Sequence, residues 1–345
     1  MFTNLTTIRL VLILLILLVI ALTILGVLQG PANISLGHIG AIFKQALLET
    51  PNNDIPNWEH SIIVDIRLPR VIIALFAGAS LALCGLVMQG MFRNPLASPS
   101  VLGVSSGASL GAVIAIYFGF SLISAWAIPL LAFIGAGISL SIVYRVASSR
   151  GQTNVATLLL SGVAISALNV AATSLLLALS LSNWDVARMI IYWTMGGLDG
   201  RTWDHVVIIL PIVLSGFVLL LFYSKQLDLL LLGEQHALSV GVDVRKTRRN
   251  LLIISSAMVG ASVSVVGGIG FIGLVVPHIL RLLLGPEHRY LLPACLFGGA
   301  ITLLGADLFL NSFFREQAIP LGVVTAALGA PFFLFLLIKQ RFVLG

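Results

Sequence analysis

Two apolar runs joined by a short polar turn, within residues 67–111, restrict what this chain can fold into more than any other feature. The first run, residues 71–91, has about 20 residues, the length that an α-helix needs to cross the hydrocarbon core of a bilayer. After the polar turn at residues 93–96, the second run carries a glycine at every fourth position: Gly103, Gly107 and Gly111. Small residues with this spacing let another helix backbone approach closely. The stretch therefore predicts two membrane-spanning helices that form a hairpin.

The composition of the whole chain agrees with a membrane protein. Hydrophobic residues make up 59% of it and charged residues 9%, whereas soluble domains carry about 25% charged residues. The net charge of +6 needs no nucleic-acid partner, because Lys and Arg collect in the cytoplasmic loops of membrane proteins. Cys84 and Cys295 both lie in apolar runs, so we interpret them as small buried residues rather than as a disulfide or metal pair.

Eight further apolar runs complete a prediction of about ten spans, with residues 1–345 forming one transmembrane domain of an all-α polytopic membrane protein. The first run, residues 8–28, is too long for the apolar stretch of a signal peptide (about 7–15 residues), which is the alternative. The later spans are expected at about residues 123–144, 155–180, 205–223, 251–266, 271–284, 291–312 and 321–338. Residues 30–66 and 183–203 are expected to be loops, the second with a short amphipathic patch at 187–195.

The distribution of basic residues orients these spans. With a cytoplasmic N-terminus, 13 of the 19 Lys and Arg lie inside and six outside. This asymmetry follows the positive-inside rule and predicts that both termini are cytoplasmic.

A faint internal repeat links two of the spans. Gly78-Ala79-Ser80 followed by Gly85 reappears as Gly260-Ala261-Ser262 followed by Gly267. Because these helices are expected to run in opposite directions, the match favours inverted repeats at about residues 67–180 and 251–338. A chance match among small residues is the alternative.

Several longer motifs resemble the FecCD family, the permease subunits of binding-protein-dependent ABC importers for iron–siderophores, haem and vitamin B12. The motifs are RLPR (67–70), FRNPLASPSVLGVSSGA (92–108), YWTMGG (192–197), GFIGLVVPHILR (270–281), GPEHR (285–289) and PLGVVTAALGAPFF (320–333). The resemblance implies a type II ABC importer permease fold in the cell inner membrane. It also implies a second copy of the chain, two cytoplasmic ATPase subunits that hold ATP and Mg²⁺, and an extracytoplasmic substrate-binding protein. This chain would hold no cofactor or metal of its own.

The resemblance also implies where the two copies meet. We expect the helix at 155–180 and the region at 321–331 to lie near the dimer axis, around a central pathway. Small residues that permit close packing mark the second region: Gly322, Ala326, Ala327, Gly329 and Ala330.

Arg67 and Arg70 are expected at the outer end of the helix at 71–91. One interpretation is interfacial anchoring, in which the side chains reach lipid headgroups. An outward pair of arginines opposes the charge bias, however, and in similar permeases arginines here form salt bridges with glutamates of the binding protein. The family's third docking arginine falls near Asn311, and Arg315, one turn further on, is the candidate to replace it.

The turn at residues 93–96 is the first candidate for a cytoplasmic gate. An ordinary Asn-Pro turn explains Asn94 and Leu96 equally well. In the resembling family this turn and the start of the fifth helix close the pathway from inside. Here the second part would be Thr153, Asn154 and Thr157.

The most charged segment, residues 224–250, is the candidate for contact with the ATPase. It contains an apolar run too short to span, a short helix-forming stretch bracketed by Gly233 and Gly241, and four basic residues at 245–249, directly before the next span. A solvated loop that only fixes topology is the alternative. In similar permeases this loop forms coupling helices, and the matching residues are Leu232, Gly233, Glu234, Ala237, Leu238 and Gly241.

Two polar sites inside spans remain to be explained. Pro277, His278 and Arg281 suggest a relay or metal site, but one histidine without a second ligand favours packing. Asp307 is the one acid well within a predicted span; we expect it to pair with a polar neighbour, and an ion-driven carrier would use it as its coupling group.

These residues leave three classes of function. The chain carries no G-x4-G-K-[ST] motif, so it is not the ATPase itself. A permease subunit powered by a separate ATPase is the leading hypothesis, an ion-driven secondary carrier the second, and a membrane-embedded enzyme, whose catalytic set we do not find, the third. An iron–siderophore is the expected cargo, with haem, cobalamin or an oxyanion as alternatives.

Overall fold

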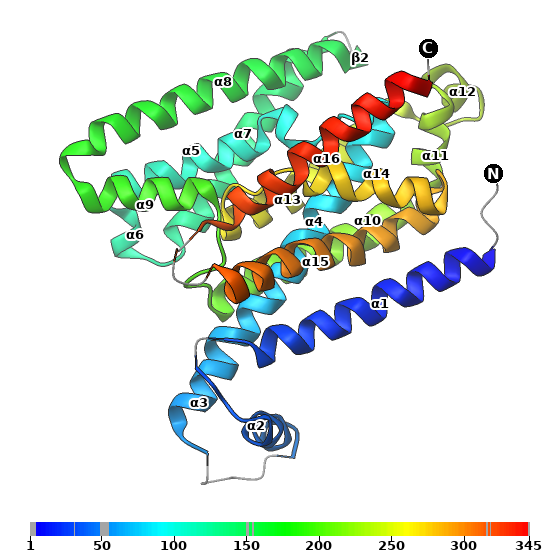
Figure 1. Ribbon diagram of the computed structural model, residues 1–345. Helices are drawn as coiled ribbons and strands as arrows, with labels where there is room; N and C mark the ends of the chain where they lie inside the picture. Colours follow the sequence, from blue (N-terminus) through cyan, green and yellow to red (C-terminus); the bar gives the residue numbers. More distant parts are fainter. Residues whose placement is uncertain are drawn as a thin grey trace.

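The computed structural model describes residues 5–30, 32–48, 55–149, 152–153, 155–314, 317 and 319–343. Its long helices lie side by side along one common direction, and α2 lies across one end of the bundle (Figure 1). The helices that open the chain are α1 (Leu5–Leu28), α2 (Leu36–Leu48), α3 (Asn57–Ser61), η1 (Ile62–Arg67), α4 (Leu68–Phe92), η2 (Pro99–Leu102), α5 (Val104–Tyr117), α6 (Phe120–Ile123) and α7 (Ala127–Ala147).

The second part of the chain begins with a strand pair of two residues each, β1 (Ser148–Ser149) and β2 (Gln152–Thr153), which is antiparallel. The helices that follow are α8 (Val155–Leu179), η3 (Ser180–Ser182), α9 (Trp184–Met195), α10 (Trp203–Phe222), α11 (Ser224–Leu232), α12 (Glu234–Ser239), α13 (Val244–Val266), α14 (Ile272–Leu284), α15 (His288–Phe313) and α16 (Leu321–Val343).

The described chain contains ten apolar helical segments that can lie in a membrane. Seven are long and apolar enough to cross it alone, and three are shorter: Val104–Tyr117, Ile272–Leu284 and Leu321–Leu334. They fall at the ten places that the apolar runs predict. The prediction of an all-α, ten-helix membrane fold is therefore confirmed.

Helix α4 forms the centre of the bundle. In an 18-residue window of its span, 83% of the residues are buried, whereas the corresponding share is 6% for α1 and 11% for α8. Two of its glycines make the close packing possible. A methyl group at Gly78 would overlap the carbonyl of Gly299 on α15, and one at Gly85 would overlap the carbonyl of Gly273 on α14. These two glycines thus permit a close helix approach. The predicted glycine stripe acts likewise on α5, where a methyl group at Gly107 or Gly111 would overlap carbonyls of α7.

The two helices that carry the repeated motif, α4 and α13, pack against each other in opposite directions. The Ser80 hydroxyl donates to the carbonyl of Met258 at 3.0 Å, and the Cys84 thiol donates to the carbonyl of Ser255 at 3.4 Å. The two helices are therefore antiparallel, as the equivalent helices of inverted repeats must be. The repeat boundaries themselves remain a prediction.

The expected loop at residues 30–66 is partly helical, which corrects the sequence-based prediction. Helix α2 buries Ile39 and Ile42 against the bundle, while α3 and η1 continue α4 outward. The continuous segment Asn57–Phe92 has 36 residues, or about 54 Å of helix, and so extends well beyond a hydrocarbon core of about 30 Å. The prolines and acids of this region favoured a loop prediction, whereas tertiary contacts stabilise short helices here.

Two other boundaries also differ from the prediction. Helix α13 begins at Val244 rather than at residue 251, because Asp243 caps it by accepting a hydrogen bond from the Lys246 backbone N–H at 2.9 Å. The basic residues of this segment therefore lie on the first turns of a helix. The amphipathic patch at 187–195 belongs to α9, which Asn183 caps.

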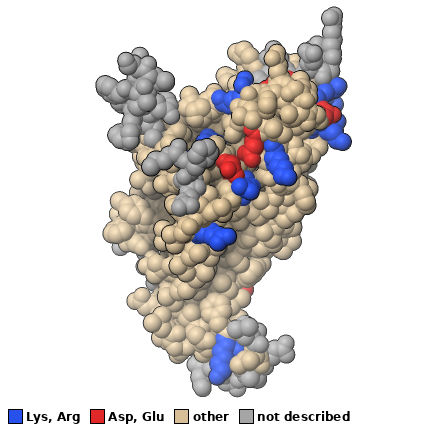
Figure 2. Space-filling view, turned by 90° about the vertical axis from the view of Figure 1, so that its right-hand side faces the viewer, with Lys and Arg blue, Asp and Glu red and all other residues tan. Residues whose placement is uncertain are grey.

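Charged side chains gather near α11, α12 and the start of α13. Figure 2, which faces the side seen on the right of Figure 1, shows most of its Lys, Arg, Asp and Glu in the upper part. Below them lies a broad band almost free of charge (Figure 2). This separation is the one that a bilayer imposes, because charges are costly in hydrocarbon.

Candidate functional site

The end of the bundle remote from α11 and α12 holds a three-residue charge cluster centred on Arg70. Its Nε and Nη2 donate to the two carboxylate oxygens of Asp307 on α15, at 2.9 and 2.8 Å. Its Nη1 donates to Asp199, in the loop between α9 and α10, at 2.7 Å. Asn311 adds a hydrogen bond to Asp307 at 3.2 Å. The side chain of Asp307 is 5% exposed and that of Asp199 is 90% exposed, so the first is a fixed partner and the second is open to water.

Asp307 therefore pairs with polar neighbours, as expected. Its two bonds to Arg70 join the first turn of α4 to α15, the helix that α4 also approaches closely at Gly78. A buried carboxylate needs such a partner, because burying an unpaired charge is costly.

Arg67, one turn before Arg70, lies differently. Its side chain is buried, with the residue 4% exposed, and its guanidinium donates to backbone carbonyls of Val27, Leu28 and Ala32 at 2.6–2.9 Å. These carbonyls lie at the end of α1 and in the segment after it, where the helix leaves acceptors unsatisfied. Arg67 thus joins α1 to α4. Its predicted docking role stays untested, as does that of Arg315, which lies outside the described residues.

Close beside Arg70, three backbone segments meet at glycines, and we call Gly196, Gly267, Gly268 and Gly322 the glycine junction. A methyl group at Gly267 or Gly268 would overlap carbonyls of the last residues of α9, and one at Gly322 would overlap the carbonyl of Met195. Two hydrogen bonds complete it, from the Gly197 N–H to Val266 at 2.9 Å and from the Leu321 N–H to Gly196 at 3.1 Å. The junction connects the Asp199 loop with the end of α13 and the start of α16.

The predicted inner turn is present. Asn94 Oδ1 accepts a hydrogen bond from the Leu96 N–H at 2.9 Å, and Arg93 ends α4 in a left-handed conformation with φ of 49°. Leu96 is 43% exposed. The short helix η2 follows and packs on α8, where Gly162 lies against the carbonyl of Val101.

The second half of the predicted gate lies at the start of α8. Thr153 is in β2 and Thr157 is in the first turns of α8, while Asn154 lies outside the described residues. The structure therefore brings the two halves onto neighbouring elements, and closure of a pathway by them remains a prediction.

The segment at 224–250 forms two short helices, α11 and α12, separated by Gly233, whose φ of +123° an L-residue rarely adopts. Ala237 is fully buried, whereas Leu232 and Leu238 are 67% and 54% exposed. Glu234 pairs with Arg248 of α13 at 2.9 Å, and Gly241, with φ of +86°, ends the unit. The predicted compact helical unit is thus present, with apolar side chains on its surface.

An interaction that the sequence did not predict fastens α11 to α15. One carboxylate oxygen of Asp228 accepts hydrogen bonds from both the backbone N–H and Nδ1 of His288, at 2.9 and 2.7 Å. His288 is fully buried and lies against Gly90 of α4. The GPEHR motif contains this histidine, but nothing in the sequence shows which acid it meets 60 residues away.

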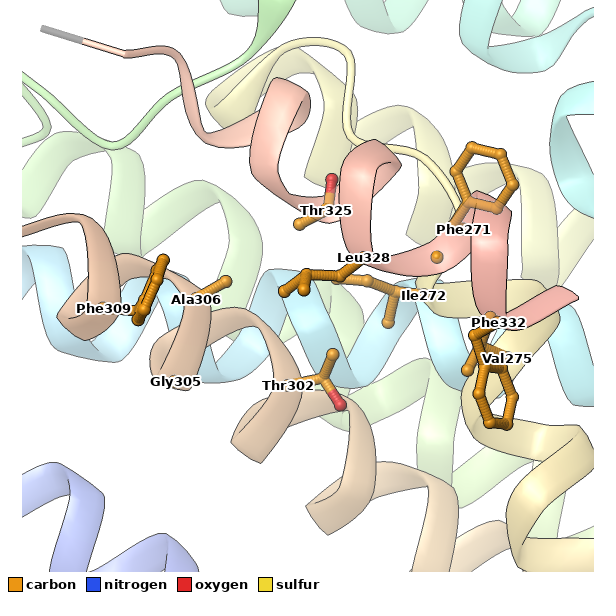
Figure 3. A pocket seen from close by; sticks show the side chains of 11 residues that line it. Phe271, Ile272, Val275, Thr302, Gly305, Ala306, Phe309, Thr325, Leu328 and Phe332 are labelled. Atoms are coloured by element: carbon orange, nitrogen blue, oxygen red, sulfur yellow. The ribbon is translucent and has the colours of Figure 1, made fainter. Parts of the chain in front are cut away.

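An apolar cavity of about 410 Å³ separates α16 from α15. Figure 3 shows its wall: Ala306 and Phe309 come from α15, Leu328 and Phe332 from α16, and Ile272 from α14. Helix α16 closes on the bundle at the glycine junction and again at Gly329, which lies against Phe271. The cavity can hold an apolar group and offers little polarity to a metal or an anion.

The polar groups of α14 serve packing. Gln89 of α4 donates to the carbonyl of Leu274 at 3.1 Å and accepts a hydrogen bond from Arg281 at 3.0 Å, so it fastens α14 to α4 on two turns. Among the described residues no group of three His, Cys, Asp or Glu side chains is placed to hold a metal ion. Cys84 and Cys295 are buried free thiols, as expected.

A bundle of ten apolar helices around a glycine-packed centre, with charged clusters at both ends, defines a polytopic membrane transport protein. The sequence profile of the FecCD transport family matches residues 14–339, and the chain belongs to this family. It is therefore a permease of the ABC importer class and a transport subunit rather than an enzyme. Such permeases lie in the inner membrane and work with separate ATPase subunits and a binding protein.

Individual relatives agree with this membership. The cobalamin import system permease protein BtuC of Halobacterium salinarum is 44% identical, over 82% of this chain and 75% of its own length. The hemin transport system permease protein HmuU of Yersinia pestis is 40% identical, over 93% of this chain and 95% of its own. A solved structure described as an inward-facing conformation of a metal-chelate type ABC transporter superposes with a TM-score of 0.83 at 31% identity, covering 95% of this chain and 98% of its own.

Proposed function

We propose that this chain forms the translocation pathway of an importer that carries a metal chelate into the cytoplasm. The observation that carries the proposal is the near full-length likeness to permeases named for hemin, cobalamin and metal chelates. An iron–siderophore belongs to the same chemical class and is the cargo expected from the sequence. The oxyanion alternative has no counterpart among these relatives.

The proposal places the Arg70 end outside and the α11–α12 end in the cytoplasm, together with both termini. It rests on the concentration of basic residues at the start of α13, where Arg245, Lys246, Arg248 and Arg249 lie within two turns. In this orientation the exposed Leu232 and Leu238 face the ATPase subunits, and the Arg70 cluster faces the binding protein. The partner ATPases hold ATP and Mg²⁺.

A transport assay tests the proposal. The permease is reconstituted in proteoliposomes with its ATPase and its binding protein, and uptake of a ferric siderophore, hemin and cobalamin is measured with and without ATP. We expect uptake of one chelate that requires ATP. Uptake driven by an ion gradient without ATP, and lost in Asp307→Asn, would instead establish the secondary carrier.

A further inference from the structure

The guanidinium of Arg70 has two hydrogen-bonding edges with different partners. The edge formed by Nε and Nη2 donates to both oxygens of Asp307. The edge formed by Nη1 and the second N–H of Nη2 is the one that a further carboxylate can approach. Asp199 occupies half of this edge through one hydrogen bond at 2.7 Å.

The two acids also differ in how easily they can be exchanged. A charge pair that includes a 90% exposed carboxylate contributes little stability, since water competes for both partners. The Asp307 pair is buried on the acid side, so breaking it leaves an uncompensated charge. A partner carboxylate that arrives at Arg70 therefore displaces Asp199 and not Asp307.

A small polar cavity lies beside this contact. It has a volume of about 80 Å³, and Arg70, Asp199, Asp307 and Asn311 line it together with residues of the loop and of the start of α16. Polar groups thus surround the replaceable side of Arg70.

The loop that carries Asp199 is tied to other helices. Gly196 and Gly200 bracket it with positive φ values of 75° and 69°. The Gly196 carbonyl accepts a hydrogen bond from the Leu321 N–H at the start of α16, and the Gly197 N–H donates to the Val266 carbonyl at the end of α13. Leu198, next to Asp199, is 2% exposed. A shift of this loop away from Arg70 would uncover Leu198 and act on the segment that accepts the hydrogen bond from Leu321 at the start of α16.

We propose that Asp199 occupies the position on Arg70 that a carboxylate of the docked binding protein takes, and that its displacement releases the 196–200 loop from α4. The inference rests on the proposed function, because it needs a binding protein at this end. It adds an internal competitor, which lowers affinity for the binding protein and links docking to the segment that holds α16.

Affinity measurements test the competition. The substrate-binding protein of this importer is titrated onto the permease in nanodiscs, using wild type, Asp199→Asn, Asp204→Asn and Arg70→Glu. Asp204 is an exposed acid that forms none of the ion pairs seen among the described residues, so its variant controls for loss of one negative charge. We expect Asp199→Asn to bind about two- to fivefold more tightly than Asp204→Asn, and Arg70→Glu to bind more weakly than wild type.

Labelling tests the release. Cys84 and Cys295 are fully buried, so a cysteine introduced at Leu198 reports alone to a water-soluble maleimide. We expect labelling of Leu198→Cys to rise when the binding protein docks, while the control Leu238→Cys, exposed at the opposite end of the bundle, labels equally in both states. Equal affinities for the Asp199 and Asp204 variants, with unchanged Leu198→Cys labelling, would overturn the inference. An unchanged affinity in Arg70→Glu would instead reject the docking site of the proposed function.

Discussion

Two arginines one helical turn apart perform different structural tasks at the start of α4. Arg67 donates to backbone carbonyls at the end of α1, and Arg70 joins α4 to α15 through Asp307. Both side chains lie among groups that match the guanidinium fork, which a lysine cannot reproduce. The same residue type thus fixes two neighbouring helices to the central one.

Arg67→Ala should destabilise the protein strongly, because it leaves carbonyls of Val27, Leu28 and Ala32 without their donor. The expected loss is about 2–4 kcal/mol, given several charge-assisted hydrogen bonds at a buried site. Thermal unfolding in detergent measures it. Arg188→Ala removes an exposed arginine and is the control; equal melting temperatures for the two variants would contradict the prediction.

Asp307→Asn should also destabilise, since it leaves Arg70 without its buried counter-charge, with an expected loss of about 3–5 kcal/mol. Asp199→Asn should cost no more than about 1 kcal/mol, because its carboxylate is 90% exposed. Denaturation of both variants under one set of conditions compares them. A larger loss in Asp199→Asn would show that the exposed contact, and not the buried one, holds the cluster.

At this scale the sequence predicted residue types better than contacts. That Asp307 needs a polar partner follows from a charge inside a span. That the partner is Arg70 does not, because the two are 237 positions apart and only the packing of α4 on α15 brings them together. The Asp199 and Asp228 contacts were missed for the same reason, since their partners lie 129 and 60 positions away in the chain.

Among the helices, the length of the apolar run determined which ones could be predicted from the sequence. Apolar runs of about 20 residues located the long spans, because a helix of that length must cover the bilayer. Helix α2 and the extension α3–η1 were not predicted, because their stability comes from burying Ile39, Ile42 and Ile63 in the apolar core of the bundle. The short helix α12 was predicted because Gly233 and Gly241 bracket it.

The α11–α12 unit allows a sharper test of energy coupling than the sequence alone. Ala237 is fully buried, so a charge there would disturb packing, whereas Leu238 is 54% exposed. Leu238→Glu should leave the permease folded and inserted but abolish ATPase docking or uncouple ATP hydrolysis from uptake. Gly233→Pro should act in the same direction, because proline cannot adopt a φ of +123°. Gel filtration of the complex, ATPase rate and uptake are measured together.

The control lies on the opposite end of the same molecule. Leu122→Glu, at an 87% exposed position in α6, adds the same charge far from α11 and α12. Import at the wild-type rate by Leu238→Glu, with normal ATP consumption, would show that this unit is not the coupling element.

The whole molecule carries two long apolar helices that its own chain hardly covers. The span of α1 is 6% buried and that of α8 is 11% buried. Lipid can cover both. The homodimer expected from the sequence would place α8, together with the region at 321–331, near the dimer axis and would leave α1 to lipid, so each of the two helices is a control for the other.

Single cysteines along the two helices distinguish these arrangements. On α8, Val163, Leu168 and Leu175 are 58%, 64% and 60% exposed; on α1, Leu10, Leu14 and Leu17 are 61%, 65% and 58% exposed. Because a two-fold interface brings equivalent residues close to the axis, we expect a short bifunctional thiol crosslinker to join two copies through some α8 positions and through none on α1. The native thiols are buried and should stay silent. Crosslinks confined to α1, or a purified complex with one permease copy per two ATPase subunits, would reject the dimer through α8 and with it a pathway between two copies of this chain.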